Sequence, residues 1–168
     1  MTVIQRKVCL LGATAVGKTS LVRRYVESMF SEKYQATIGV KIDRKLVDLD
    51  DTQVSLLLWD LQGEDDLQRV RVSYLRGAAG LMYVADGTRP ETLNTARAIQ
   101  QSVIETIGED VPSVLLLNKA DLATAWLLND AEVNARGPVG TLVLQTSART
   151  GSNVEEAFSL LVRTMQGA

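Results

Sequence analysis

A glycine-rich segment near the N-terminus carries the first residues suited to chemistry. Residues 12–19 match the pattern G-x-x-x-x-G-K-[ST], follow an apolar run and open a helical pattern. Backbone amides in such a loop, together with the helix N-terminus, can hold a phosphate group. We expect Lys18 to reach the β- and γ-phosphates of a nucleotide and Thr19 to ligate Mg²⁺. A chance glycine turn is the alternative, but such a match arises in roughly one chain per hundred from average residue usage.

A second motif, Asn118-Lys119-Ala120-Asp121, follows another apolar run and bears on the choice of base. A carboxylate can accept two parallel hydrogen bonds from the N1–H and N2–H groups of guanine, whereas adenine offers no such pair of donors. A buried Asp121 would therefore reject adenine, because its charge would be left unpaired. An ordinary polar loop would explain the segment taken alone, but not beside the phosphate-binding loop upstream.

Asp60 ends a third apolar run, and Gly63 follows three residues later. This is the expected place for a carboxylate that supports a nucleotide-bound Mg²⁺, followed by a backbone N–H that senses the γ-phosphate. Considered without the other motifs, an aspartate that ends a strand in a turn is an equally good explanation.

Short apolar runs alternate with helical patterns along the chain. The expected strands are residues 3–11, 40–49, 53–60, 80–86, 113–117 and 141–145. The turn-forming cluster at residues 50–52 predicts an antiparallel hairpin between the second and third strands. The alternation predicts an α/β fold with a mostly parallel sheet covered on both faces. Ligands bind such sheets at the carboxyl ends of the strands, where all three motifs fall.

Four helices are expected, over residues 21–30, from Thr88 onward, over 130–136 and from Ser152 onward. Thr88 with Glu91, and Ser152 with Glu155, have the spacing of capping boxes. Helical stripes of buried side chains follow both boxes. The first consists of Leu93, Ala96, Gln100, Val103 and Ile107, and the second of Val154, Ala157, Phe158, Leu161, Val162 and Met165.

The composition is that of an ordinary globular protein. The 168 residues, 46% of them hydrophobic, are enough for one domain with a real core, so we expect a single domain over residues 1–168. The net charge of −2 comes from 18 basic and 20 acidic residues mixed along the chain, which disfavours nucleic acid as the main partner. Histidine, the commonest general base, is absent.

The sequence favours a cytoplasmic location. Its single cysteine, Cys9, lies in an apolar run and is expected to be a small buried side chain, which fits a reducing compartment. No signal peptide or membrane-spanning run is visible. Thr2 excludes N-myristoylation, and no cysteine near the C-terminus offers a prenylation site, so membrane association would need a lipidated tail outside this chain.

Together these motifs resemble those of the Ras superfamily of small GTPases, most closely its Rab branch. The resemblance covers nearly the whole chain and implies a three-layer P-loop NTPase fold, the G domain, with a mostly parallel six-stranded sheet. It also implies GTP/GDP and Mg²⁺ as ligands. The matching segments are residues 37–40 of switch I with Phe30 and Tyr34 before them, 59–63 of switch II, 73–78 after it, and 146–158 at the last guanine motif.

For the phosphates and the metal, the resemblance implies a switch. Thr37 would ligate Mg²⁺ through its hydroxyl in the GTP state only, beside Thr19 and Asp60. The γ-phosphate would hold Thr37 and Gly63 in place, and its loss would release both loops. Asn118 would brace the P-loop.

For the base, the resemblance implies a set of guanine contacts. Phe30 would pack edge-on against the guanine, and Lys119 would lie along it. The Ala148 backbone N–H would bind guanine O6, and Ser147 would support Asp121. Further nucleotide contacts are expected from Ala15, Val16, Gly17, Lys18, Ser20 and Arg149.

Hydrolysis is where the chain departs from the family. Members of the family place in switch II a glutamine that orients the attacking water, whereas this chain has Glu64. A carboxylate can only accept hydrogen bonds and would be repelled by the γ-phosphate, so we predict slow intrinsic hydrolysis. Two alternatives remain: Gln62 substitutes for the missing glutamine, or Glu64 points to solvent and a partner supplies catalysis. The expected catalytic set is Lys18, Thr37, Gly63, Glu64 and Gln62.

The resemblance also implies effector, exchange-factor and GTPase-activating partners that bind at the switch regions. Rab proteins commonly use an aromatic triad for effectors. Trp59 and Tyr74 match two of its members, but Ile42 occupies the third position. Partial core packing is favoured for Ile42, whereas recognition and packing are equally supported for Trp59 and Tyr74.

Two other functions remain open from the sequence. One is a nucleotide-binding interaction module that hardly hydrolyses GTP. The other is a P-loop kinase for a small molecule, against which the Asn118–Asp121 motif and Thr37 both argue.

Overall fold

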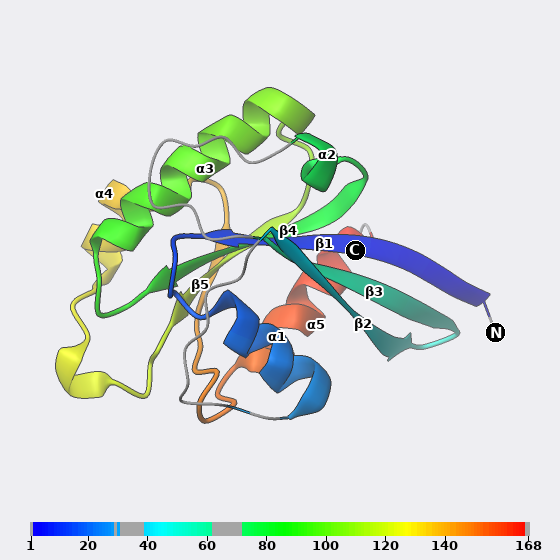
Figure 1. The fold of residues 1–168 in the computed structure, drawn as a ribbon, viewed down its shortest axis with the longest axis horizontal. Coiled ribbons are helices and arrows are strands. Elements are labelled where there is room, and N and C mark those ends of the chain that lie inside the picture. The colour runs from blue at the N-terminus through cyan, green and yellow to red at the C-terminus, as the bar shows by residue number, and fades with distance from the viewer. Residues whose placement is uncertain (1, 29, 31–38, 62–71, 167–168) are drawn as a thin grey trace.

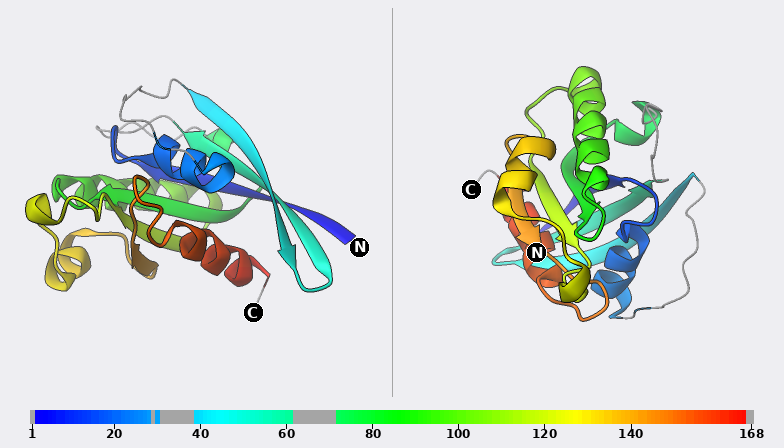
Figure 2. Two further views of the ribbon diagram at one scale, coloured as in Figure 1. Left: turned by 90° about the horizontal axis from the view of Figure 1, so that it is seen from below. Right: turned by 90° about the vertical axis from the view of Figure 1, so that its left-hand side faces the viewer.

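The structure is a computed structural model and describes residues 2–28, 30, 39–61 and 72–166. Among these residues a six-stranded sheet forms the centre of the molecule, with helices on both faces (Figure 1). The strand order is β2-β3-β1-β4-β5-β6. Figure 2 shows α3 on one side of the sheet and α1 and α5 on the other. The predicted fold class, an α/β protein with three layers, is confirmed.

The strands differ from the predicted ranges by a few residues at most. They are β1 (Thr2–Gly12), β2 (Val40–Leu49), β3 (Thr52–Leu61), β4 (Ala78–Asp86), β5 (Ser113–Asn118) and β6 (Leu142–Gln145). β1 pairs in parallel with β3 and β4, and parallel pairing continues through β5 to β6. β2 is antiparallel to β3, as the predicted hairpin requires. The carboxyl ends of β1, β3, β4, β5 and β6 therefore meet at one edge of the sheet.

The helices are α1 (Lys18–Glu27), α2 (Val72–Leu75), α3 (Glu91–Ile107), α4 (Asp130–Arg136) and α5 (Val154–Met165), with a short 3₁₀ turn, η1 (Ala123–Ala125). The sequence patterns did not predict α2 or η1, which are too short to show a period. Of the helices that the structure describes, none is long and apolar enough to cross a membrane.

The predicted start of the first helix is wrong by three residues. The helix begins at Lys18, because the P-loop passes directly into it: Gly17 is the N-cap residue and its carbonyl accepts from the Leu21 N–H at 2.9 Å. It also ends before Phe30, since Ser28 adopts a left-handed conformation with φ of 55°.

Both predicted capping boxes are wrong. Pro90 occupies the N-cap position of α3, and the Thr88 hydroxyl instead donates to Asp86 Oδ1 at 2.7 Å. Asn153 occupies the N-cap position of α5 with φ of 58°, and no side chain caps that helix. A cap that the sequence analysis missed lies on α4, where the Asn129 side chain accepts from the Glu132 N–H.

The core has two layers because the central strand is buried on both faces. In β1, Val8 and Leu10 belong to the layer beneath α1 and α5, whereas Cys9 and Leu11 belong to the layer beneath α3. Successive side chains of a strand point to opposite faces, so an uninterrupted apolar run is what such a strand requires. The same burial raises the pKa of the Cys9 thiol to about 12 and keeps it neutral.

The layer beneath α1 and α5 is closed by an aromatic pair. Tyr25 of α1 stacks on Phe158 of α5, with ring centroids 3.9 Å apart and planes within 1° of parallel. α1 is also the helix that begins at the P-loop, so this contact fixes the direction of the helix behind the phosphate-binding loop.

We expect Phe158→Ala to lower the free energy of unfolding by about 3–5 kcal/mol, because it leaves a cavity beneath α1. Urea unfolding followed by circular dichroism measures the change. Val139→Ala is the control, since Val139 is 67% exposed and its change is expected to stay within about 0.5 kcal/mol. Equal losses in the two variants would contradict this account of the core.

Candidate functional site

A cavity of about 370 Å³ lies at the carboxyl ends of the parallel strands. Its lining comes from four segments far apart in the sequence: the P-loop with the start of α1, the residue Phe30, the loop after β5 and the loop after β6. The lining residues are Ala15, Gly17, Ser20, Phe30, Asn118, Lys119, Asp121, Leu122, Ala148 and Arg149. All but Leu122 are residues for which the sequence predicts a nucleotide contact.

Two glycines of the P-loop are required by its close contacts. A Cβ on Gly12 would lie 2.4 Å from the Val84 carbonyl oxygen, and one on Gly17 would lie 2.3 Å from Asn118 Nδ2. Gly17 also has φ of 105°, in the left-handed region that favours glycine. The motif therefore places glycine where β4 and the loop after β5 press against the P-loop.

Over residues 12–16, every backbone carbonyl of the P-loop accepts a hydrogen bond from a side chain. Lys18, only 6% exposed, folds back across the loop, and its Nζ donates to the carbonyls of Gly12 and Ala13 at 3.0 Å each. The next three carbonyls each accept from one side chain: Thr14 from Arg89 at 2.9 Å, Ala15 from Lys119 at 2.9 Å and Val16 from Asn118 at 3.0 Å. With the carbonyls turned to these donors, the loop can offer its amides to an anion.

The two described residues predicted at the metal are in contact. Thr19 Oγ1 donates to Asp60 Oδ2 at 2.5 Å, and Asp60 is fully buried. The parallel pairing of β1 with β3 places Asp60 opposite Leu10, just before the P-loop. Hydroxyl and carboxylate oxygens suit Mg²⁺, which keeps waters and phosphate oxygens as its other ligands. Accordingly, no cluster of three histidine, cysteine or acidic ligands occurs among the residues described.

Asn118 joins three segments of the site. Its Nδ2 donates to the Val16 carbonyl, while its Oδ1 accepts from Thr146 Oγ1 at 3.2 Å and from the Ala148 N–H at 3.3 Å. The side chain is 2% exposed. The bracing of the P-loop that was predicted for Asn118 is therefore present, and the loop after β6 is tied to the same amide.

The Asp121 carboxylate is oriented from behind. Ser147 Oγ donates to Asp121 Oδ1 at 2.8 Å and accepts from the Thr150 N–H at 3.1 Å. This is the contact predicted between Ser147 and Asp121. The second carboxylate oxygen belongs to a side chain that lines the cavity, where it can accept from a ligand.

A buried charge beside the site was not predicted from the sequence. Asp86, the last residue of β4, is fully buried and pairs with Lys119 Nζ at 2.8 Å and with Arg89 Nε at 3.0 Å. Thr88 donates to it from both its hydroxyl and its N–H. Burial by itself would raise the pKa of Asp86, but the hydrogen bonds from Lys119, Thr88 and Arg89 outweigh it and hold that pKa below its usual value. Its position at a strand end, paired in register with Asn118, was the available signal.

The three side chains predicted to contact partners lie near one another in the structure. Ile42 faces Trp59 in the β2–β3 register, and the rings of Trp59 and Tyr74 lie 6.3 Å apart. Ile42 is 50% exposed, so the partial core packing favoured for it is wrong. It lies on β2, an edge strand whose only neighbour in the described part of the sheet is β3. Lys7 Nζ lies 3.6 Å from the Trp59 ring centroid and holds that ring in place.

Several predicted residues lie outside the part of the chain that the structure describes. They are Tyr34, Thr37, Gln62, Gly63 and Glu64. Their roles in the switch and in hydrolysis stay predictions.

The sheet order, the P-loop between β1 and α1 and the cavity beside it define a P-loop nucleotide-binding protein. A family model agrees: the Ras family matches residues 7–167. The chain therefore belongs to the Ras family, whose members are small GTP-binding switches that hydrolyse GTP, generally with Mg²⁺ bound.

We expect Asp86→Asn to lower the free energy of unfolding at pH 7 by about 1–3 kcal/mol, because the amide loses the charge-assisted hydrogen bonds to Lys119 and Arg89, whose side chains are 32% and 35% exposed. Because the folded-state pKa of Asp86 is lowered, its contribution is complete above the unfolded value of 3.8 and is lost as the pH falls through the folded-state pKa. The deficit of the variant should therefore be constant near neutral pH and shrink in acid below 3.8.

Urea unfolding at a series of pH values tests this expectation. Asp110→Asn is the matched control, because Asp110 is exposed and its change should stay within about 0.5 kcal/mol. A deficit for Asp86→Asn that grows as the pH falls would contradict the assignment.

Proposed function

We propose that this protein is a Rab-like switch in the cytoplasm that binds GTP and GDP with Mg²⁺ and hydrolyses GTP slowly without a partner. The observation that carries the proposal is the placement of the Asp121 carboxylate, held by Ser147, in a cavity that the P-loop also lines. Phosphate and base recognition are thereby combined in one site. The Rab assignment is supported by residues 37–40 and 73–78 and by the neighbouring rings of Trp59 and Tyr74, two members of the Rab aromatic triad.

Guanine is the base that this site suits best. One oxygen of Asp121 accepts from Ser147, which leaves the carboxylate oriented toward the cavity to accept from the N1–H and N2–H of guanine. The Ala148 N–H would donate to guanine O6. In the structure it donates weakly to Asn118 Oδ1 at 3.3 Å, a long contact that a guanine oxygen can replace. Phe30 and the stem of Lys119 line the same cavity and offer apolar surface to the ring.

The phosphates would be held by the P-loop amides and by the Lys18 ammonium. Thr19 would bind Mg²⁺ directly and Asp60 would hold it through water, with Thr37 added in the GTP state. When bound, the ion would neutralise the charge that develops between the β- and γ-phosphates. The Lys18 ammonium would add to this stabilisation of the phosphate charge.

The proposed switch connects this site to the partner surface through β3. Asp60, at the metal position, is the neighbour of Trp59 on the same strand, and Trp59 packs beside Tyr74 of α2. A change in the segment before β2 or in the segment after β3 would therefore alter the surface that partners contact. Thr37 and Gly63 are the residues through which the γ-phosphate would act.

Slow hydrolysis follows from Glu64. A glutamine side chain can accept from the attacking water and donate to the phosphoryl oxygens, whereas a carboxylate can only accept. Its charge also opposes the approach of water to the γ-phosphate. The same residue favours a second candidate function, an interaction module that binds GTP and hardly hydrolyses it.

We expect Asp121→Asn to shift the base preference from guanine toward xanthine. The amide can donate to the 2-oxo group of xanthine while accepting from N1–H, but it cannot accept twice from guanine. Affinity for GDP should fall by about a hundredfold or more, with xanthosine diphosphate bound better than by the wild type. Competition against a fluorescent GDP measures both, and Asp110→Asn serves as the surface control. A variant that retains the wild-type preference for GDP would contradict the assignment of the base site.

We expect Glu64→Gln to hydrolyse GTP faster than the wild type by about tenfold or more, because the amide restores a donor to the phosphoryl oxygens. Single-turnover hydrolysis of preloaded GTP measures the rate. Gln62→Ala separates the alternatives: it should leave the wild-type rate unchanged unless Gln62 already orients the water. A Glu64→Gln variant no faster than the wild type would rule out the proposed cause of slow hydrolysis, and no turnover in either would favour the interaction module.

A further inference from the structure

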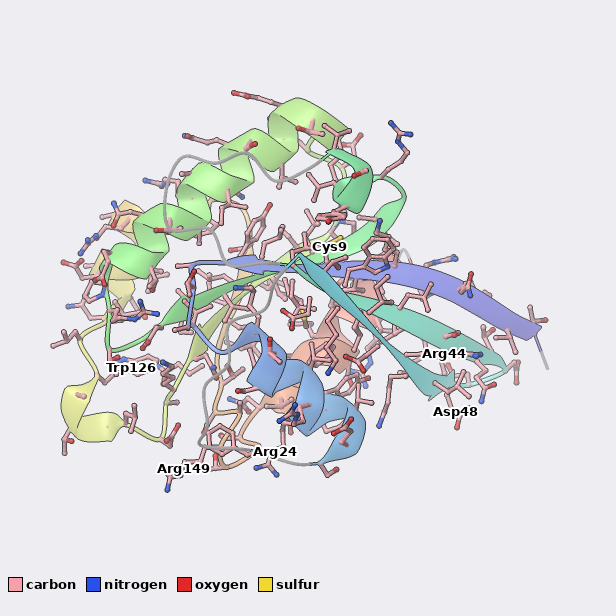
Figure 3. All side chains as sticks on the ribbon, in the orientation of Figure 1. Cys9, Arg24, Arg44, Asp48, Trp126 and Arg149 are labelled. Atoms are coloured by element: carbon pink, nitrogen blue, oxygen red, sulfur yellow. The ribbon has the colours of Figure 1, made fainter. Side chains whose placement is uncertain are left out.

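One arginine on α1 holds the loop that closes the base side of the cavity. Arg24 Nε donates to the Ala148 carbonyl at 2.7 Å, and Nη2 donates to the Arg149 carbonyl. Nη1 lies 3.5 Å from the carbonyl of Ser28, at the end of α1. Figure 3 shows Arg24 and Arg149 close together beside α1. A single guanidinium therefore connects the helix that follows the P-loop to the loop that follows β6.

The hydrogen bonds of Arg24 go to backbone carbonyls and not to an acidic partner. Of the residues described, none places a carboxylate within ion-pair distance of Arg24. The planar fork of an arginine presents separate nitrogens to two adjacent carbonyls in a fixed geometry, whereas a lysine has a single donor nitrogen. The loop after β6 also packs against the Arg24 side chain: a Cβ on Gly151 would lie 3.6 Å from Arg24 Cδ.

These contacts determine the direction of the amides on the other side of the loop. In a trans peptide the N–H points away from the C=O, so holding the Ala148 carbonyl outward turns the Arg149 N–H the opposite way. Both residues line the cavity. The Ala148 N–H, one peptide earlier, is the group assigned to guanine O6. Arg24 thus lies behind the loop that carries these amides, and is not among the residues that line the cavity.

We propose that Arg24 is a positioning residue for the guanine O6 contact and that it sets how slowly the nucleotide leaves. The proposal rests on the guanine site described under the proposed function. Without the guanidinium, the carbonyls of Ala148 and Arg149 lose their two charge-assisted hydrogen bonds, and the loop that carries the Ala148 and Arg149 amides is no longer tied to α1. Nucleotide release would then be faster, while the phosphate contacts of the P-loop, which Arg24 does not touch, would be kept.

The test is the rate at which fluorescent GDP leaves Mg²⁺-loaded protein after a chase with excess GDP. We expect Arg24→Ala to release GDP about tenfold faster than the wild type, equivalent to about 1.4 kcal/mol. Arg24→Lys and Arg24→Gln each retain a single donor nitrogen, so their GDP release rates should lie between those of the wild type and Arg24→Ala. Arg23→Ala is the matched control on the neighbouring position of α1 and should release GDP at the wild-type rate.

A second measurement separates positioning from general loosening of the fold. The affinities of wild type and Arg24→Ala are compared for GDP, inosine diphosphate and 2-aminopurine riboside diphosphate, so that a change in the protein is combined with a change in the base. Inosine keeps O6, so Arg24→Ala should weaken its binding as much as that of GDP. 2-Aminopurine lacks both O6 and the N1–H assigned to Asp121. Because the hydrogen bonds of Arg24 do not reach Asp121, Arg24→Ala should change the affinity for this nucleotide by less than about twofold. A merely structural role would weaken all three alike.

The outcomes are distinguishable. Wild-type release rates in the Arg24 variants, equal acceleration in Arg23→Ala, or an equal loss for 2-aminopurine and guanine would each overturn the role of Arg24 and leave the guanine site intact. A wild-type protein that binds no guanine nucleotide would instead refute the proposed function, and this inference with it. If Arg24→Ala fails to fold, Arg24→Lys and Arg24→Gln carry the same comparison.

Discussion

The site depends on where the P-loop carbonyls point. A loop that offers its amides to phosphate must turn its carbonyls away, and a buried carbonyl needs a donor. Over residues 12–16 every carbonyl finds one, from Lys18, Arg89, Lys119 or Asn118. Apart from Lys18, these donors come from the ends of β4 and β5. The loop that binds phosphate is therefore shaped largely by other strands of the sheet.

This arrangement couples the two halves of the nucleotide site. Lys119 and Asn118 belong to the base motif, yet each donates to a carbonyl of the P-loop. Asp86 strengthens the coupling, because its buried carboxylate pairs with both Lys119 and Arg89 and so holds two of the donors. Removing this charge would release both donors from the positions in which they meet the P-loop carbonyls. The base and phosphate halves are thus one network, and Arg24 extends it to the loop after β6.

Local sequence patterns predicted the elements well where a long period or a dense motif was present. The strands, α3 to α5 and the P-loop agree with their patterns because apolar alternation and glycine requirements act over neighbouring residues. The capping box predicted at the start of α3 is absent. Thr88 has the right type and spacing, but its hydroxyl donates to Asp86, a stronger acceptor that is itself held by Lys119 from another loop. The contact spans only two residues, but the acceptor is held in place by a residue far away in the sequence.

The chemistry of the site was readable from residue types and spacing, since phosphate, Mg²⁺ and guanine each require particular donors at particular separations. Those residues also indicated the family to which the chain belongs. The contacts that shape the site could not be predicted from the sequence. Asp86, Arg89 and Arg24 carry no motif, and their partners lie in loops that meet only when parallel strands end at the same edge of the sheet. Tertiary packing decided those contacts, because a side chain in one loop has no local signal for a carbonyl in another.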